Sequence, residues 1–291
     1  MPNIKQVNKK QSLTQDAFLR FKKDRVATIS LFIIVAILVA CFVVPWFYPD
    51  DYFSHIDLYA TTQPPSFAHF FGTDAIGRDV FIRVLVGGQI SFEVAIVATI
   101  VSVVIGTLWG AFAGFIGGKV DGFMMRVVDA LYALPFLFFA ILLVTLFGRN
   151  FILIFVAIGV VSWLDVARVV RGQAIALRHK EFVEAAKVSG LTNREIVTKH
   201  IIRNLIGIII VYITLTIPTV LMLSAFLSFL GLGVQPPMTD WGEMISDGAS
   251  YITMGYWWLL VYPAAFLTIT LLALNFVGNA MRQALDPKSK R

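Results

Sequence analysis

The sequence predicts an all-α integral membrane protein with six transmembrane helices. Hydrophobic residues make up 58% of its 291 residues, and its mean hydropathy is +0.79. Only 14% of the residues are charged, whereas about a quarter of the residues in a soluble domain carry a charge. The apolar residues also gather in long runs, and about 20 consecutive apolar residues suffice for a helix to cross a bilayer. These three observations exclude a soluble globular protein.

Six apolar runs are expected to span the membrane, at residues 26–48, 91–116, 123–147, 151–169, 205–230 and 256–278. Pro135 lies inside the third run and predicts a kink there. The first run contains Leu38-Val39-Ala40-Cys41, which is similar to a lipoprotein cleavage box. Because the apolar run continues beyond Cys41 and further spans follow, we expect this first helix to remain uncleaved.

The distribution of basic residues predicts which segments face the cytoplasm. With a cytoplasmic N-terminus, six spans place residues 1–25, 117–126, 168–204 and 279–291 inside, and these segments hold 21 of the 24 Lys and Arg residues. Such a bias is what the positive-inside rule describes. We therefore expect a cytoplasmic segment 1–25, an outer segment 49–90, a membrane core 91–278 with five spans, and a cytoplasmic tail 279–291.

The chain lacks the patterns of several other functions. Its single cysteine excludes an internal disulfide, and no Cys/His spacing suits a metal. It has no G-x-x-x-x-G-K-[ST] phosphate-binding loop, and its four histidines lie outside the expected spans, which argues against an intramembrane hydrolase. The net charge of +6 follows the membrane topology and does not predict nucleic-acid binding. We expect no catalytic residue, metal or cofactor on this chain.

Two groups of residues inside the spans are candidate functional residues. Gly106, Gly110 and Gly114 repeat at four-residue spacing, which predicts a close contact with another helix. Carboxylates inside a membrane segment are candidates for a polar pathway. We expect Asp129 to pair with Arg126 and Asp165 with Arg168, each three residues away, whereas Glu93 has no obvious local partner.

The charged segment 180–204 separates two long apolar runs and has a specific local pattern. Glu181, Glu184 and Lys187 lie at helical spacing, and Gly190 then supplies a residue that can end a helix in the left-handed conformation. Thr192-x-x-Glu195 is a capping box, so a second helix is expected to start directly afterwards. We expect a small exposed Ala185/Ala186 surface beside an exposed Phe182, suited to a groove on another protein. The alternative is a solvated charged loop.

The segment Glu184-Ala185-Ala186, followed after three residues by Gly190, is similar to the EAA loop of ABC-importer permeases. In that family the loop docks onto the cytoplasmic ATPase, so the resemblance implies a type I ABC-importer permease fold. It also implies that ATPase coupling involves Phe182, Glu184, Ala185, Ala186, Gly190 and Leu191. The oligopeptide branch usually continues with His-Ile-Leu-Pro-Asn; Arg203 stands in place of that proline, which leaves a kink at the start of the next helix in doubt.

A second signature, Gly72-Thr73-Asp74-Ala75-Ile76-Gly77-Arg78-Asp79, resembles the G-T-D-x-x-G-R-D sequence of the dipeptide/oligopeptide permease branch. We expect it to cap an amphipathic helix at the membrane surface, starting near Val80, and favour this role over contact with substrate. The run from Phe229 to Gly242 and the pair Asp286-Pro287 are similar to the same branch.

The resemblance extends over nearly the whole chain and is to the C-type membrane subunits of bacterial oligopeptide ABC importers, in the dipeptide/oligopeptide/nickel permease family. It implies an inner-membrane location, a B-type permease partner, two ATPase subunits that use ATP and Mg, a periplasmic peptide-binding protein, a peptide substrate and contact with membrane lipid. Dipeptides, muropeptides or another solute delivered by a binding protein stay open as substrates. Outside this family, the alternatives are a secondary transporter, against which the lack of internal repeats argues, and a non-transport membrane scaffold.

Overall fold

The computed structural model describes residues 21–49, 52–148 and 151–285, and helices make up most of this part of the chain. The helices in chain order are α2 (Arg25–Val43), α3 (Val80–Ile116), α4 (Gly118–Tyr132), α5 (Phe136–Phe147), α6 (Phe151–Arg178), α7 (Glu181–Val188), α8 (Asn193–Glu195), α9 (Ile202–Phe229), α10 (Trp241–Tyr251) and α11 (Trp258–Leu285). Three short 3₁₀ turns, η1 (Val44–Phe47), η2 (Tyr52–Ser54) and η4 (Ile252–Met254), and the π-helix η3 (Ile196–Ile201) complete the described elements. The prediction of an all-α membrane protein is confirmed.

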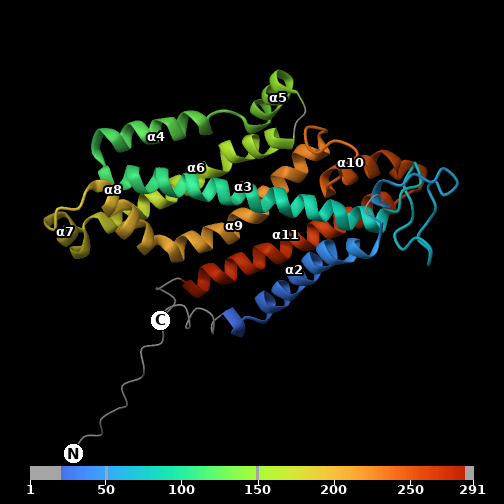
Figure 1. Ribbon diagram of the computed structural model, residues 1–291, viewed down its shortest axis with the longest axis horizontal. Coiled ribbons are helices and arrows are strands. Elements are labelled where there is room, and N and C mark those ends of the chain that lie inside the picture. The colour runs from blue at the N-terminus through green and yellow to red at the C-terminus, as the bar shows by residue number, and fades with distance from the viewer. Residues whose placement is uncertain (1–20, 50–51, 149–150, 286–291) are drawn as a thin grey trace, which may run out of the picture.

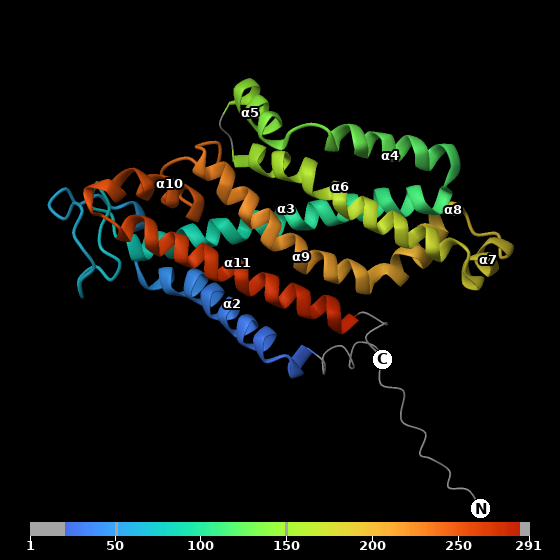
Figure 2. The same ribbon diagram turned by 180° about the vertical axis from the view of Figure 1, so that it is seen from behind.

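The bundle is organised along α3, which has 37 residues and packs against α2, α6, α9 and α10. Figures 1 and 2 show an elongated bundle with α7 and α8 at one end. The segment 52–79 and α10 lie at the opposite end (Figure 1). We call these the α7 end and the α10 end. The start of α2 and the finish of α11 lie side by side toward the α7 end, where the two helices contact each other.

Four of the described helical segments are long and apolar enough to cross a membrane: Arg25–Phe47, Val80–Ile116, Asn193–Phe229 and Trp258–Leu285. They correspond to the expected first, second, fifth and sixth spans. The α4–α5 pair is a fifth candidate if it is taken as one broken span. The α6 helix occupies the position of the expected fourth span but does not meet the same length and composition criterion, so the count of six spans stays a prediction.

The expected third span is broken more sharply than a kink. Its helix ends at Tyr132 and resumes at Phe136, and the two halves are bent by 80°. Pro135 lies at the break and is the N-cap residue of α5. A proline lacks the amide hydrogen that would continue the helical hydrogen bonds and clashes with the preceding turn, which accounts for the break.

The second span starts earlier than expected. The expected outer segment reached residue 90, but α3 begins at Val80, where the Asp79 side chain caps it by accepting a hydrogen bond from the Ile82 amide at 3.2 Å. The expected surface helix is therefore the first part of α3. Residues 80–90 enter the bundle because their polar and small residues have partners: Arg83 is buried in a polar cluster, and Gly88 lies against Cys41 and Trp241.

Two apolar cores stabilise the two ends of the bundle. The core at the α10 end joins α2, α3, α9, α10 and α11 around the fully buried Trp241. The core at the α7 end joins α3 and α6 to residues of α7, η3 and α9. Burial of apolar side chains is the dominant favourable term in packing, so each end is held to the long helices by its own core.

Candidate coupling surface and the buried polar junction

The turn after α7 is a complete Schellman motif built on Gly190. Gly190 has φ of +78°, its amide donates to the Lys187 carbonyl at 3.0 Å, and the Leu191 amide donates to the Ala186 carbonyl at 3.2 Å. These two bonds satisfy carbonyls that the end of a helix otherwise leaves without partners. The predicted left-handed glycine is confirmed.

The second helix starts with the predicted capping box. The Glu195 amide donates to Thr192 Oγ1 at 3.3 Å, and the Thr192 amide donates to Glu195 Oε2 at 3.1 Å. The chain then continues through the π-helix η3 directly into α9. The Schellman motif and the capping box together determine the direction of the chain between α7 and α9.

The exposed face of α7 differs from the expected one. Ala185 is exposed, but Ala186 is only 5% exposed and packs with Val183 in the core at the α7 end. Phe182 is half-buried against the same core. The expected Ala185/Ala186 surface is therefore wrong for Ala186, because this residue is on the face of the helix that attaches α7 to the bundle. The outward face consists of Glu181, Glu184, Ala185, Lys187 and Val188.

Val188 is the residue on this face that sequence reasoning missed. Its side chain is 90% exposed at the last position of α7, just before the Schellman turn. Lys187 lies over the Phe115 ring of α3, with its Nζ 5.6 Å from the ring centroid. We call the outward face formed by Glu181, Glu184, Ala185 and Val188 the α7 surface.

The core beneath the α7 surface connects it to α3 and α6. Buried Val183 and Ala186 pack in one cluster with Phe115 of α3 and Val170 of α6. A force applied to α7 is therefore transmitted to α3 and α6 through packed side chains, because such interiors are dense and resist compression.

The three glycines of α3 lie against α6. A Cβ atom placed on Gly106 would be 2.7 Å from the Trp163 carbonyl oxygen, and one on Gly114 would be 2.5 Å from the Arg171 carbonyl oxygen. One on Gly110 would be 2.9 Å from the Arg171 amide nitrogen. The backbones of α3 and α6 thus approach each other at all three positions, which only glycine permits.

The candidate pathway acids are arranged differently from the expectation. Asp129 pairs with Arg168 of α6 at 2.9 Å, so the expected local pairs Asp129–Arg126 and Asp165–Arg168 are wrong. These partners come from different helices, which local spacing in the sequence does not reveal. Glu93 and Asp165 are exposed, and no ion pair is found for either of them among the described residues. None of the described contacts joins the three acids to one another.

A stronger ion pair joins α4 to α6. Arg171 donates from Nε and Nη2 to the two carboxylate oxygens of Asp121, at 2.5 and 2.6 Å. Bidentate geometry of this kind fixes orientation as well as adding electrostatic energy. Because Arg171 also lies beside Gly110 and Gly114, this pair links α4 to the close α3–α6 contact.

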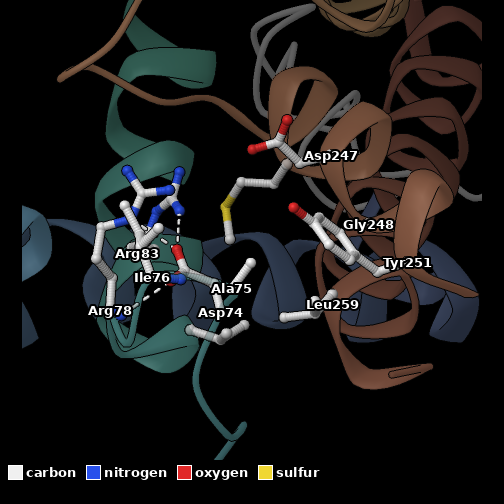
Figure 3. Close-up of a pocket in the computed structure, with 11 residues that line it drawn as sticks. Asp74, Ala75, Ile76, Arg78, Arg83, Asp247, Gly248, Tyr251 and Leu259 are labelled. Carbon is white, nitrogen blue, oxygen red and sulfur yellow. Dashed lines mark hydrogen bonds and ion pairs between the residues drawn. The ribbon is translucent and has the colours of Figure 1, made fainter. Parts of the chain in front are cut away.

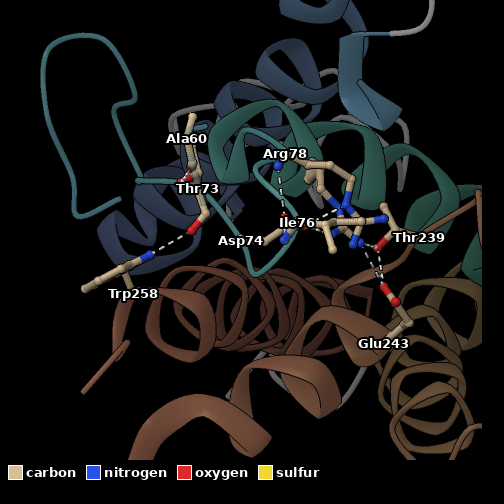
Figure 4. Close-up of polar contacts among 9 residues, drawn as sticks. Ala60, Thr73, Asp74, Ile76, Arg78, Thr239, Glu243 and Trp258 are labelled. Carbon is tan, nitrogen blue, oxygen red and sulfur yellow. Dashed lines mark hydrogen bonds and ion pairs between the residues drawn. The ribbon is translucent and has the colours of Figure 1, made fainter. Parts of the chain in front are cut away.

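At the α10 end, the signature residues 72–79 form a hydrogen-bonded loop. The Thr73 hydroxyl donates to the Ala60 carbonyl and accepts from the Gln63 amide at 2.8 Å, and the Thr73 carbonyl accepts from Trp258 Nε1 at 3.2 Å (Figure 4). We call residues 72–79 the signature loop. Thr73 thus ties the signature loop to residues 60–63 and to the start of α11.

Asp74 organises the signature loop through its carboxylate. It accepts hydrogen bonds from the amides of Ile76 and Arg78, at 3.0 and 2.9 Å, and from Arg78 Nε at 2.6 Å. Arg83 Nη1 of α3 contacts the same carboxylate. Burial by itself raises the pKa of Asp74, but the two guanidinium groups and these hydrogen bonds outweigh it and hold the pKa below its usual value.

Arg83 connects the signature loop to α10. Its side chain is only 5% exposed, and its Nη2 donates to Thr239 Oγ1 at 3.3 Å and lies 3.5 Å from Glu243 Oε2 (Figure 4). The Thr239 hydroxyl in turn donates to Glu243. We call Asp74, Arg83, Thr239 and Glu243 the polar junction. The only sequence signal for the polar junction was an arginine inside an otherwise apolar stretch. Glu243 lies 160 residues after Arg83 in the chain, so the sequence does not reveal that the two meet.

The start of α10 is anchored between α3 and α9. Trp241 Nε1 donates to the Val84 carbonyl of α3 at 2.9 Å. The Asp240 carboxylate caps α10 through the Glu243 amide and accepts from Ser228 of α9 at 2.5 Å. Burial raises the pKa of Asp240 to about 6. The Asp240-Trp241-Gly242 run thus holds α10 in place at its first turn.

Comparison with known proteins agrees with this architecture. Residues 106–291 match the family model described as "Binding-protein-dependent transport system inner membrane component", and residues 12–65 match "N-terminal TM domain of oligopeptide transport permease C". The solved structure of a chain of the MetNI methionine ABC transporter, in inward-facing conformations, aligns with a TM-score of 0.55 over 70% of this chain and 96% of that chain. Its sequence identity is 20%, so it supports the fold alone.

Curated relatives cover nearly the whole chain. The oligopeptide transport system permease protein OppC of Haemophilus influenzae is 49% identical over 96% of this chain and 90% of its own length. The OppC of Escherichia coli is 47% identical over 96% and 93%, and that of Bacillus subtilis is 41% identical over 99% and 94%. The chain therefore belongs to the family of inner-membrane permease components of binding-protein-dependent transport systems.

Proposed function

We propose that this chain is a transmembrane permease subunit of an ABC importer that carries oligopeptides into the cytoplasm. The observation that carries the proposal is the exposed α7 surface. It belongs to a helix that is followed by a capped turn and a second helix, and whose inner face packs against α3 and α6. Relatives at 41–49% identity that are named as oligopeptide permeases support the substrate class. The subunit itself is non-catalytic in this proposal, and partner ATPase subunits hydrolyse ATP with Mg.

The proposal places the α7 end in the cytoplasm and the α10 end in the periplasm. Segments 117–126 and 168–204, which hold 10 of the 24 Lys and Arg residues, lie toward the α7 end, and positive loops stay inside. Both termini are cytoplasmic in this orientation, with six spans in the bacterial inner membrane. Of the expected cytoplasmic segments 1–25 and 279–291, residues 1–20 and 286–291, including Asp286-Pro287, lie outside the described residues.

The partners follow from this orientation. Two ATPase subunits dock on the cytoplasmic side, one of them on the α7 surface. The contact residues there are Glu184, Ala185 and Val188. They are positioned by Phe182, Gly190 and Leu191. A B-type permease completes the translocation pathway within the membrane, and a periplasmic peptide-binding protein docks at the α10 end. ATP hydrolysis then rocks the attached helices and switches the pathway between outward and inward access.

Changing the α7 surface without disturbing its fold tests the proposal. Ala185→Arg places a large charged side chain on an exposed position, so it should leave the bundle folded but prevent ATPase subunits from co-purifying in detergent. Thr198→Arg is a matched control, since Thr198 is also exposed but lies on η3 outside the α7 surface. If the two variants retain equal amounts of ATPase subunits, the α7 surface is not the coupling contact.

A further inference from the structure

The polar junction has an uneven balance of charge. Asp74 is bound by two guanidinium groups and by backbone amides, so its charge is well satisfied. The Glu243 carboxylate accepts from Thr239 and, at 3.5 Å, from Arg83, and it also interacts with a second carboxylate, Asp247, one turn further along α10. The link from Arg83 to the loop is therefore tighter than its link to α10.

A pocket of about 130 Å³ lies beside this link, between the signature loop and α10. Asp74, Arg78 and Arg83 line one side, and Asp247 and Tyr251 of α10 line the other (Figure 3); Met244 of α10 also lines the pocket. Asp247 is exposed, and the Glu243 side chain is itself 15% exposed, so solvent reaches both carboxylates. Protons can therefore exchange with Glu243 without any rearrangement of the bundle.

We propose that Arg83 and Glu243 are positioning residues that clamp α10 against the signature loop, and that protonation of Glu243 loosens this clamp. An ionised Glu243 shares the Arg83 guanidinium with Asp74. A neutral Glu243 leaves that guanidinium to Asp74 alone, so α10 loses its charged contact with the loop. Trp241 keeps the first turn of α10 anchored, and the later residues Met244 to Tyr251 are the part that gains freedom.

The titration of Glu243 falls in a usable range of pH. Burial raises the pKa of Glu243 to about 7; the Thr239 hydrogen bond and the Arg83 charge lower this pKa, and the neighbouring Asp247 carboxylate adds a smaller rise. The other charged groups near it are Asp74 and Arg78 of the signature loop and the buried Asp240. The only charged residues of the adjacent α9 and α11, Arg203 and Arg282, lie at the opposite ends of those helices.

The sign of the pH effect follows from linkage. Between the ordinary pKa of a glutamate and about 7, the folded chain holds a proton on Glu243 that the unfolded chain has lost. The contribution of Glu243 to the free energy of unfolding therefore falls as the pH rises through this range and levels off above it. The clamp, in contrast, is closed above pH 7 and open below it, because it needs the ionised carboxylate.

Thiol labelling in the detergent-solubilised complex tests the clamp directly. In a Cys41→Ala background, Met244→Cys places a thiol in the pocket, and its labelling rate is divided by that of Ser250→Cys, an exposed position on the same helix, at each pH. The ratio should rise about fivefold between pH 8 and pH 6. Protonation of Glu243 removes the charge from its contact with Arg83, and a charge-assisted hydrogen bond is roughly twice as strong as a neutral one. An unchanged ratio would overturn the proposal.

Two variants separate Glu243 from other titrating groups. Glu243→Gln keeps the shape of the side chain but cannot ionise, so its ratio should stay at the acidic value at every pH. Asp247→Asn removes the neighbouring carboxylate and should move the transition to lower pH, which gives a second test if Glu243→Gln fails to fold. Wild-type pH dependence in either variant contradicts the proposal.

The consequence for transport rests on the proposed function, but the labelling does not. The labelling uses neither ATP nor peptide, so it can succeed even if the chain is no peptide importer. If the chain is one, the clamp lies at the end where the binding protein docks. The stimulation of ATPase activity by peptide-loaded binding protein should then depend on pH in the wild type and not in Glu243→Gln. A Glu243→Gln complex with wild-type pH dependence would exclude this consequence while leaving the import function intact.

Discussion

The close contact between α3 and α6 makes a quantitative prediction for Gly110→Ala. The new Cβ would lie 2.9 Å from the Arg171 amide nitrogen and 3.0 Å from Val170 Cβ, and still nearer the Ala167 carbonyl oxygen. None of these atoms can rotate away, since two belong to the backbone and the third is a Cβ. Such overpacking costs about 1–3 kcal/mol. For a chain of this size that lowers Tm by about 2–12 °C.

The matched control is Gly172→Ala, which changes a glycine on the facing helix where nothing lies within 4 Å of the added atom. Removing a helical glycine there should leave Tm unchanged or raise it slightly. The Tm values of the two detergent-solubilised variants are compared by heating each protein and measuring by size-exclusion chromatography the fraction that stays folded. Equal Tm values for Gly110→Ala and Gly172→Ala would refute the close contact. Gly110→Leu should go further and prevent assembly; if it assembles normally and changes peptide preference, the glycine stripe lines the pathway instead.

Two further predictions follow from the same structure. Asp121→Asn should lower Tm more than Asp129→Asn, because the Asp121 side chain is 13% exposed and paired with Arg171 at two atoms, whereas that of Asp129 is 65% exposed; equal effects would mean that the α4–α6 pair adds nothing. In a cysteine-free background, Ser250→Cys should react with a membrane-impermeant thiol reagent added to whole cells and Ser189→Cys should not; the reverse pattern would invert the topology.

Local motifs were predictable from the sequence, whereas contacts between distant segments were not. The Schellman turn at Gly190 and the capping box at Thr192 each need only a few consecutive residues, so their residue types identified them. The break at Pro135 was also visible, but its 80° angle depends on how α5 packs against α6. Where the determining contacts are local, sequence and structure agree.

The polar junction shows why the remainder could not be predicted. Arg83 was placed in the outer segment 49–90, on a helix expected to lie at the membrane surface. The structure buries it by supplying Asp74 from a loop and Glu243 from a helix some 160 residues later. In the same way, Asp129 was given a partner three residues away, but its real partner is Arg168 on another helix. Ala186 was expected to face a partner because the helical phase of a short charged segment does not reveal which side the bundle covers.

The central claim is that the α7 surface transmits the energy of ATP hydrolysis. Gly190 is the most direct place to test it, because its φ of +78° is needed for the turn, while nothing lies within 4 Å of an added Cβ. Any substitution there acts through the backbone alone. Gly190→Val forces a β-branched residue into the left-handed conformation at about 1–2 kcal/mol or more, whereas Gly190→Asn is tolerated because asparagine visits that conformation.

ATP hydrolysis by the reconstituted complex, with and without peptide-loaded binding protein, is the decisive measurement. Stimulation by the loaded binding protein should fall by about tenfold or more in Gly190→Val and be retained in Gly190→Asn, with the affinity of the binding protein for peptide unchanged, since 1.4 kcal/mol corresponds to a factor of ten. Glu184→Gln should have a smaller effect, because an exposed charge pair contributes under about 1 kcal/mol. Full stimulation in Gly190→Val would contradict the account and leave the α7 segment as a solvated connector.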